Sequence, residues 1–297
     1  MQPSQLLFHG LRAIERACPP TLLAILVWPV AATVGLAQAC GRPGRQYRRR
    51  MARVDGAEPG LWESWRQAVD RLFMRLVCLW PDRFLVDPWR SRLSITGLDE
   101  VRDRLAAGTP VVFTALHYGE LILLYSVLRA QGIPVASLTV AGDRRYRGLT
   151  DAVADRAGGL VGVPRRFLRD TDLRQAYCFL RSGGSLLITC DHSSSHCVDV
   201  ATDLGSVRLA TGAFHMAGMA GACVVPAILW QEHRWRFGLD CGAPLDVSGD
   251  GPDAFKRVAA ACVAHWAPVL TRHPEQYNYR DHRIWTPTPR PAAPSPA

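Results

Sequence analysis

The stretch VVFTALHYGE, residues 111–120, predicts a buried strand that ends in a polar turn. Its first six residues are mostly apolar and rich in β-branched and aromatic side chains, which is typical of a strand inside a sheet. The turn begins at His117 and leads into an apolar segment with helical character. This order of strand, polar turn and helix indicates an α/β fold.

The same alternation continues on both sides of this stretch. It predicts a mainly parallel sheet with helices on both faces, in which the carboxyl ends of the strands hold the chemistry. Two polar clusters follow strands of this kind, HYGE at 117–120 and DHSSS at 191–195. Besides residues 111–116, strands are expected at 93–97, 135–140, 185–190 and 222–230, and helices at 98–107, 121–130, 145–157, 173–181 and 210–220.

A histidine at the mouth of a buried strand, with a carboxylate nearby, is the arrangement that general-base catalysis on an alcohol requires. Imidazole titrates near neutrality, and the acid fixes its tautomer and stabilises the imidazolium. His117 and Glu120 supply such a pair. The alternative is structural: His117 is an ordinary strand-end histidine and Glu120 interacts favourably with the first turn of the next helix.

Charge and cysteine content narrow the range of partners. The net charge of +9 favours anionic partners, namely nucleic acid, anionic lipid or a phosphorylated substrate. Beyond Tyr47, no aromatic residues alternate with the arginines of residues 42–53, so nucleic-acid binding is not expected. The nine cysteines form no C-x-x-C pair and the histidines show no ligand spacing, so no metal site is expected and the thiols fit a reducing compartment.

The N-terminal region has the composition of a membrane anchor. No residue is charged between Cys18 and Gly41, a length that spans or enters a bilayer, with a kink expected at Pro29. A cluster of arginines follows at 42–53, which by the positive-inside bias places the bulk of the chain in the cytoplasm, beside an anionic membrane surface. A buried core helix and a cleaved export signal ending near residues 37–39 are the alternatives.

The predicted organisation has three parts. Residues 1–53 form the anchor with its basic segment, residues 54–285 the α/β domain, and residues 286–297 a disordered tail rich in proline and alanine. Within the second part, apolar residues recur at helical spacing from Leu61 to Leu76. This amphipathic helix either packs against the domain or lies on the membrane.

Several blocks of the sequence, in order along nearly the whole chain, resemble the bacterial late lipid A acyltransferases. This lauroyl/myristoyl acyltransferase family lies within the lysophospholipid acyltransferase superfamily. The closing block PEQYNYRDHRIW is the most distinctive of them. The blocks are residues 95–99 with Gly108 and the strand leading to His117-Tyr118-Gly119, residues 180–192, residues 210–226, and residues 274–285.

The resemblance implies a single glycerol-3-phosphate acyltransferase-like domain on the cytoplasmic face of the cell inner membrane, acting in lipid A or related glycolipid biosynthesis. His117 would deprotonate a hydroxyl of a lipid acceptor, which attacks an acyl thioester of acyl carrier protein or coenzyme A. No metal or cofactor is needed. Arginines expected in loops after strands, Arg145, Arg165, Arg166 and Arg169, would hold phosphates of the acceptor or donor.

One position departs from the family pattern. The family has an acid five residues after the catalytic histidine, where this chain has Ile122. Glu120 is the nearest carboxylate, Asp191 at the neighbouring strand end is a second candidate, and a catalytically weak or inactive relative that binds lipid or acyl donor is the third outcome. A hydrolase would need a nucleophile beside His117, and Cys190 is expected in the core because adjacent strand residues point to opposite faces.

Overall fold

The computed structural model describes residues 20–55, 58–78, 90–119, 121–139, 166–168, 172–192, 194–202, 205–233, 236–247, 251–277 and 285–287. This part of the chain divides into two compact units. The first is formed by residues up to 73, apart from a short stretch at 53–56, and the second contains all the strands.

The described part of the first unit is made of α2 (Pro20–Cys40), most of α3 (Arg42–Asp55) and most of α4 (Leu61–Cys78). One face of α2 packs on α4: the Trp65 indole Nε1 donates to the Ala32 carbonyl at 2.9 Å, and a Cβ on Gly35 would meet the Val69 side chain. The amphipathic helix expected over residues 61–76 is therefore present, and it packs on the uncharged helix before it.

The uncharged N-terminal segment is helical, as predicted, but its spanning role is not confirmed. Pro29 lies inside α2, and no acidic or basic residue occurs in it. Among the described residues, no helix is both long enough and apolar enough to cross a bilayer.

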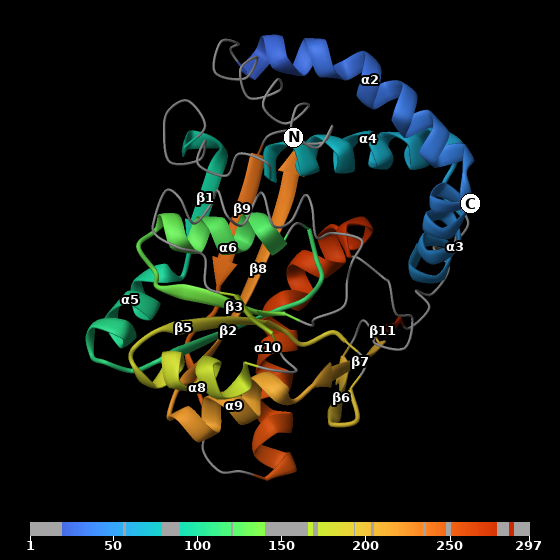
Figure 1. Ribbon diagram of the computed structural model, residues 1–297. Coiled ribbons are helices and arrows are strands. Elements are labelled where there is room, and N and C mark those ends of the chain that lie inside the picture. Colours follow the sequence, from blue (N-terminus) through green and yellow to red (C-terminus); the bar gives the residue numbers. More distant parts are fainter. Residues whose placement is uncertain are drawn as a thin grey trace, which may run out of the picture. The chain divides into compact units, whose positions relative to one another are not determined.

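The second unit contains an eight-stranded mixed sheet in the order β1-β9-β8-β2-β5-β3-β4, with β10 beside β8 (Figure 1). Neighbouring strands are parallel except where β8 pairs with β9 and β10. The predicted mainly parallel sheet is confirmed. Its strands are β1 (Leu93–Thr96), β2 (Val111–Ala115), β3 (Val135–Thr139), β4 (Arg166–Leu168), β5 (Ser185–Thr189), β8 (Cys223–His233), β9 (Arg236–Cys241) and β10 (Leu245–Asp246).

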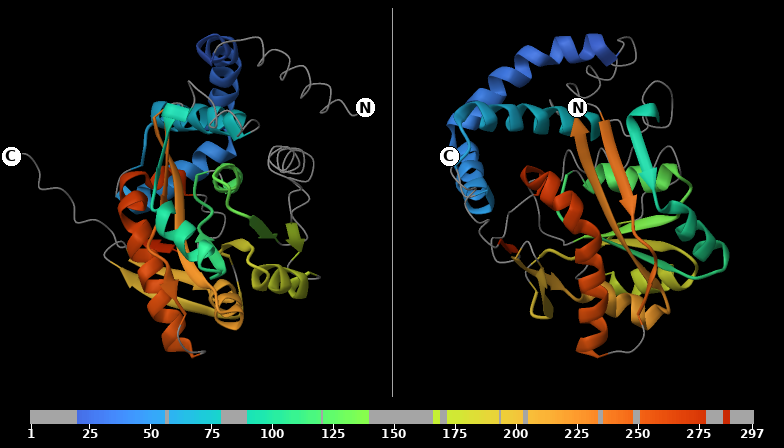
Figure 2. Two further views of the ribbon diagram at one scale, coloured as in Figure 1. Left: turned by 90° about the vertical axis from the view of Figure 1, so that its left-hand side faces the viewer. Right: turned by 180° about the vertical axis from the view of Figure 1, so that it is seen from behind.

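Helices cover both faces of this sheet, which explains why β2 is buried along its whole length. Alternate residues of β2 enter two cores: Val111 and Phe113 pack with α5 (Leu98–Ala106) and α6 (Leu121–Ala130). Val112 packs with α8 (Leu173–Arg181), α9 (Gly212–Ala220) and α10 (Pro252–Arg272). Figure 1 shows α6 above the central strands and α8 and α9 below them, and Figure 2 shows α10 along the sheet from behind.

A smaller three-stranded sheet follows the order β11-β7-β6, in which each pair is antiparallel. Its strands are β6 (Cys197–Thr202), β7 (Gly205–Ala210) and β11 (Trp285–Pro287). This corrects the predicted tail at its start, because Thr286 and Pro287 extend β11 and pair with Ser206 and Gly205. Residues 288–297 and the helix expected over 145–157 lie outside the described part.

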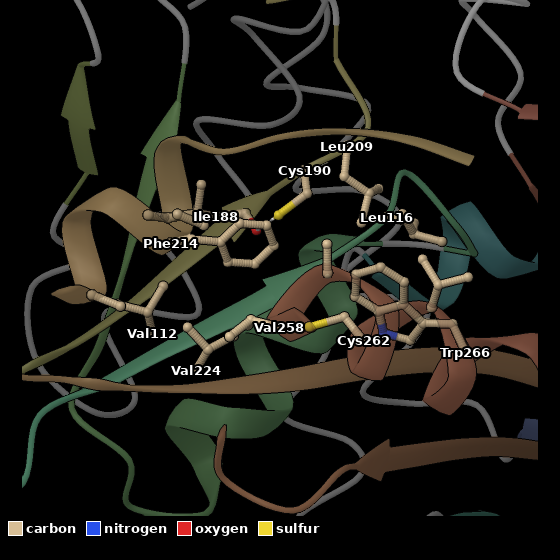
Figure 3. Close-up of a cluster of buried hydrophobic side chains, with 14 of the residues drawn as sticks. Val112, Leu116, Ile188, Cys190, Leu209, Phe214, Val224, Val258, Cys262 and Trp266 are labelled. Carbon is tan, nitrogen blue, oxygen red and sulfur yellow. Dashed lines mark hydrogen bonds between the residues drawn. The ribbon is translucent and has the colours of Figure 1, made fainter. Parts of the chain in front are cut away.

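Buried thiols give the core a predictable response to alkali. Burial raises the pKa of Cys241 and of Cys262 from the ordinary 9.0 to about 12, and it also raises that of Cys190. Figure 3 shows Cys190 and Cys262 among the apolar side chains of the core between sheet and helices. Above pH 9 the unfolded chain therefore releases protons that the folded chain retains, and folding stability falls as pH rises.

We expect each such thiol to lower the free energy of unfolding by up to about 1.4 kcal/mol per pH unit above pH 9. Urea unfolding of the wild type and of Cys241→Ala between pH 8 and 11 measures this. Subtracting one chain from the other removes the contribution of other groups that titrate at alkaline pH. The free energy of unfolding of Cys241→Ala should fall less steeply with pH than that of the wild type. Parallel slopes would show that Cys241 does not retain its proton in the folded state.

Candidate active site

The register of two neighbouring strands brings His117 and Asp191 together. In the parallel pair of β2 and β5, Ala115 lies opposite Thr189, and His117 and Asp191 each follow two residues later. The Cys190 amide continues the pairing by donating to the Ala115 carbonyl at 3.0 Å. Both side chains therefore emerge at the carboxyl ends of the strands, where α/β sheets carry their sites.

Asp191 binds His117 at two points. Its Oδ1 lies 2.7 Å from the ring Nδ1, and its Oδ2 accepts the backbone N–H of the same histidine at 2.6 Å. The Asp191 side chain is 1% exposed, whereas that of His117 is 37% exposed. The carboxylate is thus held inside the protein and the imidazole lies at the surface.

This geometry suits a general base. An ionised carboxylate only accepts hydrogen bonds, so the Nδ1 that faces it carries the proton and the lone pair is on Nε2. The buried negative charge also stabilises the imidazolium that forms when Nε2 takes a second proton. The pair therefore has both properties of a histidine base oriented by an acid.

The turn after β2 is fixed by its glycine and by a distant part of the chain. Gly119 has φ +54°, and a Cβ there would lie 2.5 Å from the Leu229 carbonyl oxygen. The Gly119 amide donates to the Gln276 carbonyl at 3.0 Å, and the Tyr118 hydroxyl donates to the His273 carbonyl at 2.7 Å. Residues 273–277, which include η3 (Pro274–Gln276), thus hold the segment that carries His117.

The other predicted site residues are not brought together by the described structure. Glu120, Arg145, Arg165 and Arg169 lie outside the described residues. Arg166 is expected in a loop but is instead the first residue of β4, which is separated from β5 by β3; its side chain lies outside the described part. Ile122, at the position of the family's acid, is in the first turn of α6.

Cys190 belongs to the core, as the alternation of strand residues predicts. It is buried against α9 and α10 residues, and burial raises the pKa of its thiol well above the ordinary value. A protonated, inaccessible thiol is a poor nucleophile. Over the described residues, no group of three His, Cys, Asp or Glu side chains is arranged to hold a metal ion.

The contribution of Gln276 to this region was not foreseen. In the sequence, residues 274–285 are distinguished only by their resemblance to a family block, which implies no role in the site. A glutamine that pairs with backbone 45 residues away leaves no periodic pattern, so only the distinctiveness of the block could have indicated it.

We expect Gly119→Ala to destabilise the chain more than a matched glycine replacement. Gly108 also has positive φ, at +78°, but a Cβ there meets nothing within 4 Å, so Gly108→Ala isolates backbone strain of about 1–2 kcal/mol. Gly119→Ala adds the clash with Leu229 and should cost roughly 1–3 kcal/mol more in urea unfolding. Equal losses in the two variants would show that the close approach to Leu229 is not a constraint.

Comparison with known proteins adds no assignment. No family model matches the chain, and no curated protein matches its sequence.

Proposed function

We propose that this chain is a membrane-associated acyltransferase that moves a fatty acyl group from a thioester to a hydroxyl of a lipid acceptor. The observation that carries the proposal is the contact between the buried Asp191 carboxylate and the His117 ring at 2.7 Å. It supplies an oriented histidine base at a strand end. The resemblance of the sequence blocks to the late lipid A acyltransferases provides the reaction class.

The chemical step begins with the acceptor hydroxyl, whose proton passes to Nε2 of His117 as its oxygen attacks the thioester carbonyl carbon. The tetrahedral intermediate then collapses, the carbon–sulfur bond breaks, and the imidazolium returns the proton to the departing thiolate. Asp191 stabilises the imidazolium between the two steps. All atoms balance without a metal or cofactor, and the products are the acylated lipid and a free thiol.

We assign the orienting acid to Asp191. It replaces the family's acid at the position of Ile122 by reaching the ring from the neighbouring strand. Glu120 is retained as the second candidate acid. Arg145, Arg165, Arg166 and Arg169 are proposed to bind phosphates of a lipid A-like glycolipid or lysophospholipid acceptor, or of the carrier arm of acyl carrier protein or coenzyme A.

The first unit supports association with the cytoplasmic face of the inner membrane. The face of α2 that does not pack on α4 exposes large apolar side chains, Ile25, Val30, Val34 and Leu36. On α3, the exposed arginines Arg42, Arg45 and Arg49 recur at helical spacing and form one stripe. An apolar face beside a basic helix has the composition of a surface that enters the interfacial region of an anionic membrane.

The catalytic test replaces the two partners separately. We expect His117→Ala to lower the rate of acyl transfer by roughly a hundredfold to ten-thousandfold, because the general base is lost. Asp191→Asn should have an effect of similar order, since an amide nitrogen facing Nδ1 favours the wrong tautomer. The measurement is transfer of radiolabelled acyl from acyl carrier protein and from coenzyme A to lipid acceptors, followed by thin-layer chromatography.

Glu120→Gln is the matched control, because it also removes one carboxylate charge and retains the size of the side chain. Full activity in Glu120→Gln with loss in Asp191→Asn assigns the acid to Asp191, and the opposite result assigns it to Glu120. Full activity in His117→Ala would show that His117 is not the general base. A folded wild type that binds acyl donor or lipid but transfers nothing would favour the non-catalytic binding protein.

Membrane association is tested by flotation with lipid vesicles. Val30→Asp with Leu36→Asp should lower binding of the full chain to phosphatidylglycerol vesicles by about tenfold or more, because charge is placed on the apolar face. Arg42→Gln with Arg49→Gln should weaken binding to anionic vesicles alone, by roughly 1 kcal/mol for each arginine.

The matched control places two aspartates at exposed positions of the α/β unit, Ala107→Asp with Gln175→Asp, and should bind as the wild type does. Unchanged flotation of the Val30 and Leu36 variant would show that the exposed face of α2 does not contact lipid.

A further inference from the structure

The strand β8 extends beyond its parallel neighbour β2. Their pairing ends at Thr114 and Pro226, while β8 continues to His233. The backbone groups of β8 on this side therefore need partners other than β2, because buried N–H and C=O groups are costly to leave unpaired. Gly119 lies against the carbonyl of Leu229. Leu229 is on β8, two residues before Gln231.

The side chain of Gln276 supplies the missing partner at Gln231. Its Oε1 accepts the Gln231 backbone N–H at 2.8 Å, and its Nε2 donates to the Gln231 carbonyl at 2.6 Å. One amide thus makes the two bonds that a residue of an adjacent strand would make. This attaches the chain at 276 to the part of β8 that extends beyond β2.

The backbone of the same residue holds the turn that carries His117. The Gln276 carbonyl accepts the Gly119 amide at 3.0 Å. The two preceding amides have other partners: that of His117 donates to Asp191 on the neighbouring strand end at 2.6 Å, and that of Tyr118 donates within the turn to the Leu116 carbonyl at 2.7 Å. Three successive N–H groups are therefore fixed, and the third depends on a residue anchored to β8.

We propose that Gln276 is a positioning residue for His117. Its side chain fixes the position of residues 273–277 along β8. Its backbone carbonyl then holds Gly119, so that the His117 ring remains hydrogen-bonded to Asp191. The catalytic consequence of this arrangement rests on the proposed function, whereas its effect on the ring geometry does not.

The chemistry of glutamine explains why this side chain suits the position. Both an acceptor and a donor are needed at a fixed separation, and an amide provides them. An ionised glutamate at position 276 would place a second oxygen against the Gln231 carbonyl, and asparagine is one methylene shorter. Methionine retains nearly the length and shape of glutamine but makes neither bond.

The test uses the full chain with ¹⁵N-labelled histidine, and it compares Gln276→Met with the wild type by NMR. His117→Ala identifies the resonance of the ring. In Gln276→Met we expect exchange of the His117 Nδ1 proton with water to be faster by about tenfold or more, because both Gln231 groups lose their partner and the turn loosens. An unchanged exchange rate in Gln276→Met overturns the proposal.

Thr96→Val is the control for general loss of stability. Thr96 Oγ1 also bonds a neighbouring strand, at the Leu239 carbonyl and Asp240, but it lies on the edge strand β1, which is separated from β8 by β9. With urea added to match the two variants in free energy of unfolding, Thr96→Val should retain the wild-type exchange rate of His117. Equal acceleration in both variants would reduce Gln276 to a structural role and overturn the proposal.

A second measurement on the wild type does not depend on whether Gln276→Met folds. The amides of Gly119 and Gln231 should show the same free energy of opening in hydrogen exchange, since one residue holds both. Independent opening of the two amides contradicts the proposal.

In acyl-transfer assays, Gln276→Met should lower kcat by roughly tenfold to a hundredfold with little change in KM, as expected for a misplaced base. If the wild type transfers no acyl group, the proposed function fails while the NMR and exchange measurements still decide the role of Gln276. If the variant keeps the wild-type kcat while the wild type is active, the positioning role fails by itself.

Discussion

The Asp191 carboxylate accepts two N–H groups of one residue, the ring Nδ1–H and the backbone amide of His117, and this double contact constrains the second unit of the structure. Both oxygens are used, so the carboxylate fixes the ring and the path of the chain at once. The charge is compatible with burial because each carboxylate oxygen accepts a hydrogen bond. In this fold the contact depends on β2 and β5 being adjacent, parallel and in register.

The apolar layers meet that requirement. Residues of β2 and β5 alternate between two cores, and each core is closed by a different set of helices. A strand covered on both faces has little freedom to slip, because a shift of one residue would exchange the side chains of the two cores. Burial therefore sets the register, and the register places the aspartate beside the histidine.

The central strands were predictable because VVFTA and SLLIT are short apolar runs bounded by turns. The carboxyl ends of these strands indicated where the site would lie. Asp191 could be named from the sequence only as the second candidate for the partner of His117, because Glu120 is close in sequence and Asp191 is close only after two strands pair. The antiparallel β9 and the smaller sheet were missed, since their strands are short and interrupted by glycine or charge. The regular spacing from Phe255 to Leu270 was sufficient to indicate α10, but that segment was not assigned.

The dependence of the His117 turn on residues 273–277 has a consequence during synthesis. The bond between Tyr118 and His273 joins groups 155 residues apart, so the turn is not supported while the ribosome is still making α10. Domains fold as their segments emerge, at about 5–20 residues per second. All strands of the larger sheet are therefore made before the turn is completed, and a product terminated before residue 273 would retain much of the core but lack the support of its histidine.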